Sequence, residues 1–560
     1  MEKRVVAAIA LAIAVLLAFR YLEERRLAEL AKQRPPIPQQ APASRPAVAP
    51  PAAAASAPKP APPMPLPAEE RVPERTVVIE GDLYRAVLDN HGGVLTGWQL
   101  KKYKAANGDI FDMVATTHME QRQYPASLIL DDPTLTALAN EENYSVEVGD
   151  GGSADTTLRP PATVVMRLRR SDLVIEKRFH FEPANYLVDF SATCQRGNQF
   201  LKGRIFLAQD IGPEEEHLLN RSIQLQAVAY LNGKVQRYSA PKDENQVQTV
   251  TGEVFWVGLD MQYFAEIAIP SPPAAAFEIQ RKPVKAVDLG GHELARDLIR
   301  LTIPADPSAD CRIYLGPKLQ SQLAAVPGVD LSGVIDYGWS SFLVTPLLAG
   351  LKFIDQYTRN YGFAIILLTF AITLALFPLR LRQMVSMKKM QVLQPKIKEI
   401  QEKYRRYKKT DPKRAEMNQE IMAVYREHKV NPLGGCLPLL LQMPLLWAFY
   451  RLLANSIELR QAPFVGWIHD LSAKDPYFVL PIAMGITMLI SQKMTPMAPG
   501  ADPTQAKMML IMPFIFTYMF LWLSAGLNLY FLCSNVFQIA FQKIAERWVG
   551  DKRSGRKSKG

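Results

Sequence analysis

Long uncharged stretches gather at two places in the chain, one at its start and the others in its last 220 residues. An apolar run of 15 residues occupies positions 5–19. The later stretches hold 20, 21, 17 and 35 residues without a charge, at 360–379, 430–450, 476–492 and 508–542. A helix needs about 20 apolar residues to cross the hydrocarbon core of a membrane. The pattern therefore predicts a C-terminal membrane domain and a short N-terminal apolar segment.

The stretch 508–542 is too long for one crossing. At about 1.5 Å per residue its helix would be roughly 52 Å long, which is enough for two crossings if the chain turns at Ser524-Ala525-Gly526. The basic segment 380–430 is expected in the cytoplasm by the positive-inside rule. The stretches 430–450 and 476–492 then cross outward and back, which returns the chain to the cytoplasm after 492. Two crossings within 508–542 leave the basic tail 543–560 in the cytoplasm as well. Six spans in all are predicted.

Between about 70 and 330 the pattern changes to short alternating or β-branched runs. The clearest runs are 76–79, 163–168, 173–181, 186–190, 204–208 and 254–257. Turn dipeptides separate them at Asn107-Gly108, Asn232-Gly233 and Gly290-Gly291. Such runs predict strands, so we expect an all-β domain of about 260 residues, a sandwich or a similar fold.

Charge is distributed as unevenly as hydrophobicity. The net charge of +11 combines +5 in residues 1–67, −10 in 68–340, +9 in 380–430 and +5 in 543–560, with +1 in each of the segments 341–379 and 431–542. This places the acidic β domain outside, in a periplasm, and the basic segments inside. Residues 35–67 hold 13 Pro and 10 Ala, which is typical of an extended spacer. The run 5–19 fits a signal-peptide core or a membrane anchor, and the lack of a nearby cleavage site favours an uncleaved anchor.

Enzyme and metal motifs are missing from the sequence. Four cysteines in 560 residues form no CxxC pair, and the seven histidines are scattered. No phosphate-binding loop, HExxH or GxSxG motif occurs. We therefore expect no catalytic residues, no metal and no cofactor. No span carries an acidic residue in its middle, which argues against a cation-coupled pump.

The basic segment 381–430 predicts two helices, 390–409 and 412–429, joined at Thr410-Asp411 with Pro412 opening the second. Apolar residues share one face of each helix: Ile397, Ile400, Tyr404 and Tyr407, then Met417, Ile421 and Tyr425. This hairpin is either a solvated topology signal or a docking arm for lipid headgroups, a partner protein or ribosomal RNA. The basic tail leaves the same alternatives open.

Several polar residues interrupt the spans. Thr369 and Thr373 lie four residues apart on one face of the second span, Gln442 lies in the third, and Asn528, Ser534 and Asn535 lie in the last. Polar side chains in hydrocarbon are costly and face a partner helix or a wet cavity. The residue pattern leaves interhelical bonding and a hydrophilic groove as alternatives.

Short motifs in the membrane domain resemble those of the YidC/Oxa/Alb membrane insertases. They are KVNPLGGC at 429–436 with Pro438 and Gln442-Met443-Pro444, LRQAPF at 459–464, WIHDLS at 467–472, DYGW at 336–339, FPL at 377–379 and QKM at 492–494. The resemblance covers roughly 310–545. The preceding anchor, spacer and large β domain make the chain similar to the Gram-negative form of the bacterial YidC branch.

The resemblance implies a non-enzymatic insertase and chaperone for nascent membrane proteins in the bacterial inner membrane. Five helices would enclose a hydrophilic groove open to the cytoplasm and to lipid, without use of a nucleotide. The implied partners are the Sec translocon, the ribosome through the basic loop and tail, and anionic phospholipids. The periplasmic domain resembles a β-supersandwich without a catalytic role, and residues 342–357 resemble the family's amphipathic surface helix.

The groove shows one departure from the family pattern. Bacterial relatives carry an arginine five residues before the proline of the FPL motif, where this chain has Thr373. We expect neutral groups to line the groove: Thr369, Thr373, Gln442, Asn528 and Tyr530. Arg380 and Arg382 would lie at its entrance and attract acidic substrate tails. The resemblance suggests Met443, Trp447, Phe516 and Trp522 as a slide for substrate helices, with ordinary helix packing or lipid contact as the alternative.

The predicted segments are the anchor 1–22, the linker 23–69, the β domain 70–335, the surface helix 336–359, span 2 at 360–380, the hairpin 381–430, span 3 at 431–455, a periplasmic loop 456–475, span 4 at 476–492, a cytoplasmic loop 493–507, spans 5 and 6 at 508–524 and 526–546, and the tail 547–560. A solute channel or transporter is the alternative function, although no internal repeat supports it. A tethered sugar-binding module is a third possibility. The sequence leaves open whether Cys194 and Cys311 pair.

Overall fold

The computed structural model describes residues 72–105, 108–114, 123–149, 157–208, 226–244, 246–287, 293–305, 308–407, 412–428, 437–494 and 503–557. The predicted anchor and the whole of the predicted linker lie outside these residues, as do the turn at Thr410-Asp411 and the motif at 429–436. The described chain forms two compact units. The β unit comprises Glu69–Gly350 and Pro444–Ala462, and the helical unit comprises Leu351–Met443 and Pro463–Gly560.

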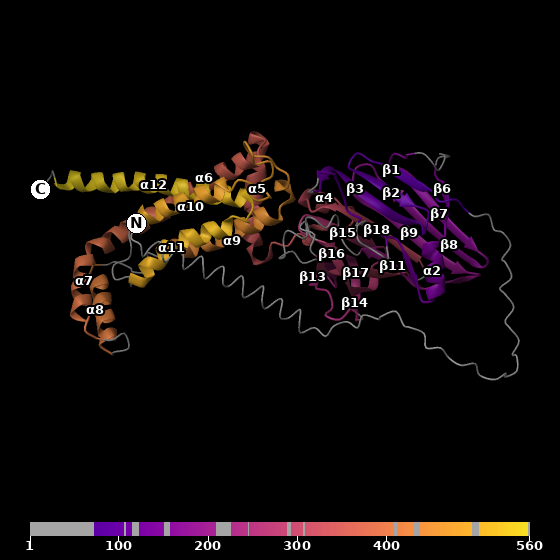
Figure 1. Ribbon diagram of the computed structural model, residues 1–560, viewed down its shortest axis with the longest axis horizontal. Coiled ribbons are helices and arrows are strands. Elements are labelled where there is room, and N and C mark those ends of the chain that lie inside the picture. Colours follow the sequence, from indigo (N-terminus) through magenta and orange to yellow (C-terminus); the bar gives the residue numbers. More distant parts are fainter. Residues whose placement is uncertain are drawn as a thin grey trace, which may run out of the picture. The chain divides into compact units, whose positions relative to one another are not determined.

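The β unit contains two antiparallel sheets (Figure 1). The smaller sheet has the order β1 (Thr76–Glu80), β2 (Tyr84–Asp89), β3 (Val94–Lys104) and β4 (Ile110–Asp112). The larger sheet has the path β5 (Leu128–Leu130), β11 (Gly203–Ala208), β17 (Glu293–Ala305), β16 (Ala274–Val287), β14 (Val247–Asp260), β15 (Phe264–Pro270), β18 (Ser308–Pro317), β9 (Leu187–Arg196), β8 (Leu173–Phe181), β7 (Ala162–Arg170) and β6 (Ser145–Val148). Off this path, β10 (Gln199–Phe200) pairs with β9, while β12 (Gln226–Leu231) pairs with both β13 (Lys234–Tyr238) and β14.

Each predicted strand run lies in or overlaps an observed strand, and the run 173–181 coincides with β8. Residues of β8 alternate between buried and less buried positions, as expected for a strand with one face in a core. The predicted turn Asn232-Gly233 joins β12 to β13, with φ values of 50° and 77°. Both values lie in the left-handed region that a type I′ hairpin turn requires. Local sequence therefore determines this hairpin.

Aromatic rings hold the two sheets together. Phe111 on β4 stacks on Phe264 on β15, with ring centroids 4.2 Å apart. Tyr84 on β2 stacks on Trp98 at 4.2 Å and also contacts Phe181 on β8 at 6.4 Å. Aromatic pairs at these separations add specific attraction to the apolar area that they bury. The small sheet therefore packs on the large one as a second layer.

The expectation of an all-β domain is wrong in detail, because the β unit also contains the short helices α2 (Pro133–Glu141) and α4 (Gln320–Ala324). The Asp132 carboxylate accepts a hydrogen bond from the Thr134 amide at 2.8 Å, and Pro133 occupies the first helical turn. These are standard start signals for a helix. Cys194 and Cys311 are free, buried thiols in the β unit. Burial raises their pKa values to about 11 and about 12.

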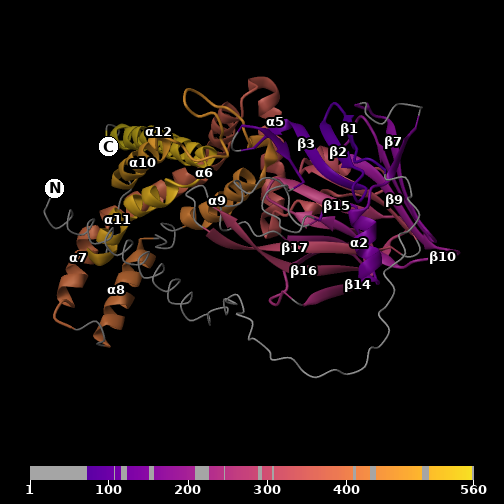
Figure 2. The ribbon, with the colours of Figure 1, turned by 45° about the vertical axis from the view of Figure 1, so that its right-hand side comes forward.

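The helical unit is built from α6 (Tyr361–Val392), α7 (Gln394–Lys403), α8 (Lys413–Glu427), α10 (Val479–Met494), α11 (Pro503–Phe520) and α12 (Ala525–Lys557). Helix α12 packs against α6 and α10, and α10 packs against α11. Figure 2 shows α7 and α8 side by side. Helices α5 (Ser341–Thr358) and α9 (Leu437–Asn455) each contribute residues to both units.

The basic hairpin is present, but its first helix begins at Gln394 rather than at Met390. Helix α6 continues through Val392, and Pro395 lies in the first turn of α7. Proline lacks the amide hydrogen and clashes with the preceding turn, which favours a helix break here, although α6 itself continues through Pro378. An apolar cluster joins the end of α6 to the two arms; its members are Met390, Leu393, Ile397 and Tyr425. Lys403 and Glu420 join the arms through a 2.8 Å ion pair.

Residues 508–542 fall into two helices. Helix α11 ends at Phe520 and α12 begins at Ala525, so the turn lies at 521–524 and slightly before the predicted turn. Helix α12 also extends past the predicted end of the last span into the basic tail. Within the described part of the chain, one segment, Tyr361–Leu379, is long and apolar enough to cross a membrane by length and composition. Val479–Met494 and Leu510–Phe520 are shorter apolar helices.

Candidate functional site

Helix α6 has two opposite faces. Thr369 and Thr373 are 1% and 3% exposed, and each hydroxyl donates to the carbonyl four residues earlier, at 2.6 and 2.7 Å. Large apolar side chains are exposed on the same helix at intervals of three or four residues: Phe363, Leu367, Phe370 and Leu374. A helix in water has the reverse arrangement, with apolar residues inside. Helix α6 therefore presents an apolar surface outward and polar groups inward.

Helix α10 carries a similar exposed stripe. Its members are Val479, Ile482, Ile486 and Ile490. On its buried side Gly485 lies against Thr517 of α11, so closely that a methyl group at position 485 would overlap the Thr517 side chain. Extended apolar surface of this kind marks a protein or membrane contact.

Asn528 and Tyr530 are buried on α12, with 0% and 2% of their surface exposed. The Asn528 amide donates to the carbonyls of Phe520, Leu523 and Ser524 at 3.1, 3.3 and 3.3 Å. These carbonyls belong to the end of α11 and to the turn, and those of Phe520 and Ser524 also accept backbone amides, from Leu523 at 3.2 Å and Asn528 at 3.1 Å. The Asn528 oxygen has no hydrogen-bond partner among the described residues. Asn528 therefore closes the turn between α11 and α12 and retains one open acceptor.

The predicted slide residues differ in exposure. Met443, Trp447 and Trp522 are 53%, 45% and 54% exposed, whereas Phe516 is half-buried. The Trp522 ring meets Tyr518 edge to face, with centroids 4.8 Å apart. Three of the four residues are therefore accessible.

The remaining predicted site residues are placed by their backbone alone. Gln442 lies on α9, and Arg380 and Arg382 lie on α6, but the side chains of all three are outside the described part of the chain. Both arginines follow Thr373 on the same helix, at a distance of roughly 10–14 Å along its axis. Neither can lie at the depth of Thr373.

Arg460, a member of the LRQAPF motif, has a role that the sequence did not reveal. It is 7% exposed within the β unit, and its guanidinium lies over Phe264, Phe111 and Tyr263, 5.2, 5.3 and 5.9 Å from their ring centroids. One of its amino groups donates to the Lys104 carbonyl at 2.6 Å. Aromatic faces and a carbonyl are the environment in which a buried guanidinium is stable.

Neighbouring residues strengthen this attachment. The Gln461 side chain exchanges two hydrogen bonds with the Lys104 backbone, at 2.6 and 3.1 Å. Ile457 belongs to the hydrophobic core of the β unit, and the Gln262 amide donates to the Ala454 carbonyl at the end of α9 at 2.6 Å. Burial raises the pKa of Tyr103 above its usual range, as do Tyr186 and Glu458 more weakly, while Arg460 opposes the rise. The segment 456–462 is thus an integral part of the β unit.

Comparison with known proteins identifies both units. The family profile described as the 60Kd inner membrane protein matches residues 353–552, and that of the YidC periplasmic domain matches residues 76–349. A membrane protein insertase YidC of Citrifermentans bemidjiense is 36% identical over 571 residues, which cover 98% of this chain and all of the relative. The chain belongs to the YidC family of membrane protein insertases. The YidC insertase of Haemophilus influenzae is 32% identical over 87% of this chain and 88% of its own length.

A solved structure of an active YidC insertase, with its first transmembrane domain resolved, also matches the chain. It covers 83% of this chain and 94% of its own, with 16% identity and a TM-score of 0.36.

Membership in the YidC family confirms the resemblance found in the motifs. The chain is a membrane protein insertase of the inner membrane, its β unit matches the family's periplasmic domain, and its substrates are membrane proteins. An insertase moves a polypeptide between environments and is not an enzyme in the catalytic sense. The channel or transporter alternative is therefore set aside.

Proposed function

We propose that the helical unit inserts nascent membrane proteins through a hydrophilic groove lined by Thr369, Thr373, Gln442, Asn528 and Tyr530. Unsatisfied polar groups crossing hydrocarbon cost several kcal/mol each. A polar recess inside the helical unit shortens that path. The buried hydroxyls on α6 and the open Asn528 oxygen support this assignment. Because these groups are neutral, the groove acts through hydrogen bonding rather than through a buried cation.

The proposed topology has six spans, five of which form the insertase core. Both termini lie in the cytoplasm and residues from about 23 to 359 lie in the periplasm, where the β unit forms a supersandwich. The charge distribution supports this orientation, because the basic segments 380–430 and 543–560 flank the spans. The exposed stripes on α6 and α10 would face lipid.

The entrance and the exit of the groove involve different residues. Arg380 and Arg382 attract acidic substrate tails at the cytoplasmic entrance. Met443, Trp447, Phe516 and Trp522 guide the apolar substrate helix into lipid. The exposure of three of these four side chains supports a contact role.

The proposed partners use the remaining charged and aromatic surfaces. The hairpin of α7 and α8 receives the substrate and, with the basic tail, contacts the ribosome and anionic phospholipids. Helix α5 lies on the outer membrane surface, which is supported by the 67%, 59% and 75% exposure of Phe342, Phe353 and Tyr357. As a chaperone, the protein also receives some clients from the Sec translocon.

The observation that carries the groove proposal is the pair of opposite faces on α6. The test places a photo-crosslinking amino acid at Thr373 or Gln442 and uses stalled ribosome–nascent chains of a small membrane protein. Ile486, which is 54% exposed on α10, provides a control position on an apolar exposed face. We expect crosslinks to the nascent chain from Thr373 and Gln442 and few from Ile486. Efficient insertion without crosslinks from Thr373 or Gln442 would contradict the groove assignment.

A further inference from the structure

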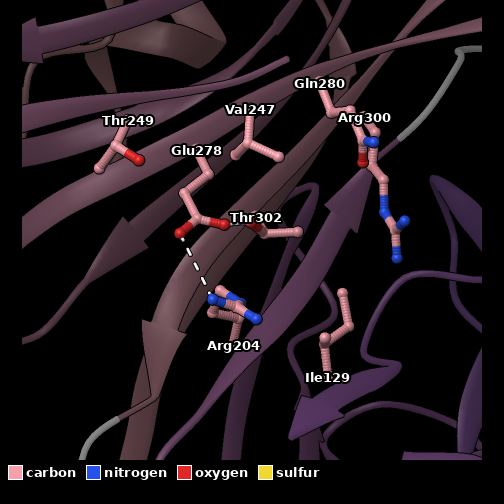
Figure 3. A pocket seen from close by; sticks show the side chains of 8 residues that line it. All are labelled: Ile129, Arg204, Val247, Thr249, Glu278, Gln280, Arg300 and Thr302. Atoms are coloured by element: carbon pink, nitrogen blue, oxygen red, sulfur yellow. Dashed lines mark hydrogen bonds and ion pairs between the residues drawn. The ribbon is translucent and has the colours of Figure 1, made fainter. Parts of the chain in front are cut away.

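A pocket of about 330 Å³ lies on one face of the larger sheet in the β unit (Figure 3). Its lining comes from five strands that are neighbours in the sheet: Ile129, Arg204, Val247, Thr249, Glu278, Gln280, Arg300 and Thr302. Strand register explains the grouping, since Gln280 pairs with both Val247 and Arg300 while Glu278 pairs with Thr249 and Thr302. Alternate residues of the same strands, Phe277, Ile279 and Leu301, point into the hydrophobic core. The pocket therefore opens on the face opposite the core.

Positive charge exceeds negative charge in this pocket. Among the described residues that line it, Arg204 and Arg300 are cationic and Glu278 is the one acid. Glu278 accepts from Arg204 at 3.5 Å and from Thr302 at 3.4 Å. Several ion pairs elsewhere in the β unit are shorter, among them Arg170–Glu142 at 2.7 Å and Arg196–Asp172 at 2.9 Å. The pocket acid is therefore loosely held and leaves one cation uncompensated.

Arg300 is the less neutralised of the two arginines. Its guanidinium lies over the Phe206 ring, 5.9 Å from the centroid, and its buried Nε has no hydrogen-bond partner among the described residues. Burial, followed by the neighbouring charge of Arg204, lowers the pKa of Arg300 below its ordinary value, while Glu278 opposes the shift. A buried donor without an acceptor is costly, so the Arg300 guanidinium has fewer compensating contacts than a buried cation requires.

We infer that this pocket binds the side-chain carboxylate of an acidic polypeptide segment. The guanidinium of Arg300 presents a planar fork of donors that matches the two oxygens of a carboxylate. Glu278 keeps its contacts with Arg204 and Thr302, so the bound carboxylate brings the pocket to neutrality. The inference rests on the proposed function, because it takes the segment to be a translocated part of an insertion substrate on the periplasmic side.

The size of the pocket favours a peptide side chain over a whole lipid. Pockets for drug-sized ligands enclose roughly 300–1,000 Å³, so about 330 Å³ is at the lower end of that range. Val247 at the rim is 48% exposed, which leaves the pocket open to a chain passing over the sheet. An extended acidic segment could place one carboxylate inside while its backbone stays outside.

The test introduces a photo-crosslinking amino acid at Val247 of the full-length protein in detergent. The probe is a labelled peptide rich in Asp and Glu, titrated against a matched peptide with Asn and Gln. A crosslink from Val247 forms only with peptide bound at the pocket, so peptide bound to the basic hairpin of α7 and α8 does not add to the signal. We expect saturable labelling by the acidic peptide and little by the neutral one, and Arg300→Gln should weaken the apparent affinity at least about tenfold.

Two further variants exclude trivial explanations. Arg196→Gln removes an arginine that is paired with Asp172 outside the pocket, and it should leave labelling unchanged. Glu278→Gln removes the competing acid and should strengthen acidic-peptide labelling severalfold, a gain that misfolding cannot produce. Equal labelling by both peptides, or equal loss in Arg300→Gln and Arg196→Gln, would overturn the inference.

Competition distinguishes other sources of anions. Inorganic phosphate or vesicles of anionic phospholipid are added as competitors of the labelled acidic peptide. If either blocks the labelling at Val247 at concentrations well below that of the peptide, the pocket belongs to that anion and the inference is overturned. Insertion of a small membrane protein into vesicles is measured in parallel. If the wild-type protein inserts normally but the acidic peptide does not label its pocket, the inference about the pocket is refuted and the proposed function is not. If the wild-type protein does not insert the membrane protein, the proposed function is refuted.

Discussion

Lys177 lies on the core face of β8 and is 0% exposed. Its ammonium donates to the carbonyls of Gly92 and Ala126 at 2.6 and 2.9 Å and lies 5.3 Å from the centre of the Tyr144 ring. Burial lowers its pKa from 10.5 to about 7. The folded protein therefore binds fewer protons at this site than the unfolded chain does between pH 7 and 10.5.

This difference predicts a pH-dependent stability. Because the unfolded chain holds the extra proton, the Lys177 contribution to the free energy of unfolding rises with pH in that window, by at most about 1.4 kcal/mol per pH unit. Lys177→Met should remove this positive slope. The measurement is the unfolding midpoint of the wild-type and variant proteins at about pH 7.5 and about pH 9.5.

The wild-type protein must be compared with Lys177→Met because Glu266 has the opposite effect on how stability depends on pH. Burial raises the pKa of Glu266 well above its ordinary value, so its contribution to stability falls as pH rises. Glu266 is present in both proteins, and the difference between their slopes isolates Lys177. Identical slopes would contradict the assignment of a neutral Lys177 at alkaline pH.

The buried guanidinium of Arg460 yields a second prediction. Arg460→Gln removes three ring contacts and a charge-assisted hydrogen bond, so the β unit should lose about 2–4 kcal/mol of stability. Arg460→Lys should recover only part of this loss, because an ammonium lacks the planar guanidinium face. Thermal unfolding and proteolytic cleavage within 456–462 are the measurements.

The control is Arg196→Gln, which removes an exposed arginine from the same unit and should leave both readings nearly unchanged. Full stability in Arg460→Gln would show that Arg460 does not hold the segment in place.

The burial of Lys177 could be predicted from the sequence, whereas the burial of Arg460 could not. Alternation along 173–181 puts Lys177 on the same face as Ile175 and Phe179, so its burial could have been predicted. The partners of Arg460 are Lys104, Phe111 and the Tyr263–Phe264 pair, which lie hundreds of residues earlier in the chain. Such long-range contacts have no local signal, so the motif could be recognised without its structural reason.

At the scale of elements, the polar face of α6 can be tested without disturbing the helix. The hydroxyls of Thr369 and Thr373 donate within their own helix, so valine at either position should leave the fold intact. If these hydroxyls line the groove, Thr369→Val with Thr373→Val should lower insertion into vesicles severalfold.

The matched control is Thr487→Val on α10. The Thr487 hydroxyl donates to the Met484 carbonyl at 2.8 Å, so this change removes a similar bond within another helix of the same unit. Insertion should be retained in that variant. An equal loss in both proteins would assign the effect to helix stability instead of to the groove.

The close approach of α10 and α11 gives a prediction of its own. A methyl group at position 485 would overlap Thr517, so Gly485→Ala should destabilise the helix pair by about 1–3 kcal/mol. Thr517→Ala in the same protein removes the overlapping atoms and should restore most of the loss. Unfolding of the single and double variants measures the coupling between them. Additive losses would contradict a direct contact.

Element boundaries show where sequence reasoning succeeds and where it stops. Start signals such as Asp132 and Pro133 are local and could have revealed α2, and Pro395 explains why α7 begins where it does. The turn at 521–524 depends instead on Asn528, whose side chain reaches back to three carbonyls. An asparagine within an apolar run gives no sign of which backbone groups it will bind.

For the whole molecule, the separation of charge predicts how substrates are selected. Replacing both Arg380 and Arg382 with glutamine should impair insertion of clients with acidic tails more than of clients with neutral tails. Lys396→Gln with Lys398→Gln on α7 removes the same charge from exposed hairpin positions and serves as the control. Insertion of paired acidic and neutral clients is the measurement, and equal impairment of both clients would refute the entrance role.

The family and the division into a β-rich domain and a helical domain could both be predicted from the sequence. Motifs gave the family and alternation gave the β-rich domain, because both depend on residues close together in the chain. Two features could not be read in this way: the layering of a small sheet on a large one through Phe111 and Phe264, and the membership of 456–462 in the β unit. Each depends on pairings between distant segments.

The burial of Ile457 in the core of the β unit has a consequence for the order of events during synthesis. A ribosome completes every strand from β1 to β18 before it reaches residue 457. The core of the β unit therefore stays incomplete while α6, the hairpin and α9 are being made. In the proposed topology, α9 is the third span, and residues 456–462 can fill their place only after α9 has brought them to the same side of the membrane as the strands. Under that topology, completion of the β unit's core would report that α9 has been correctly inserted.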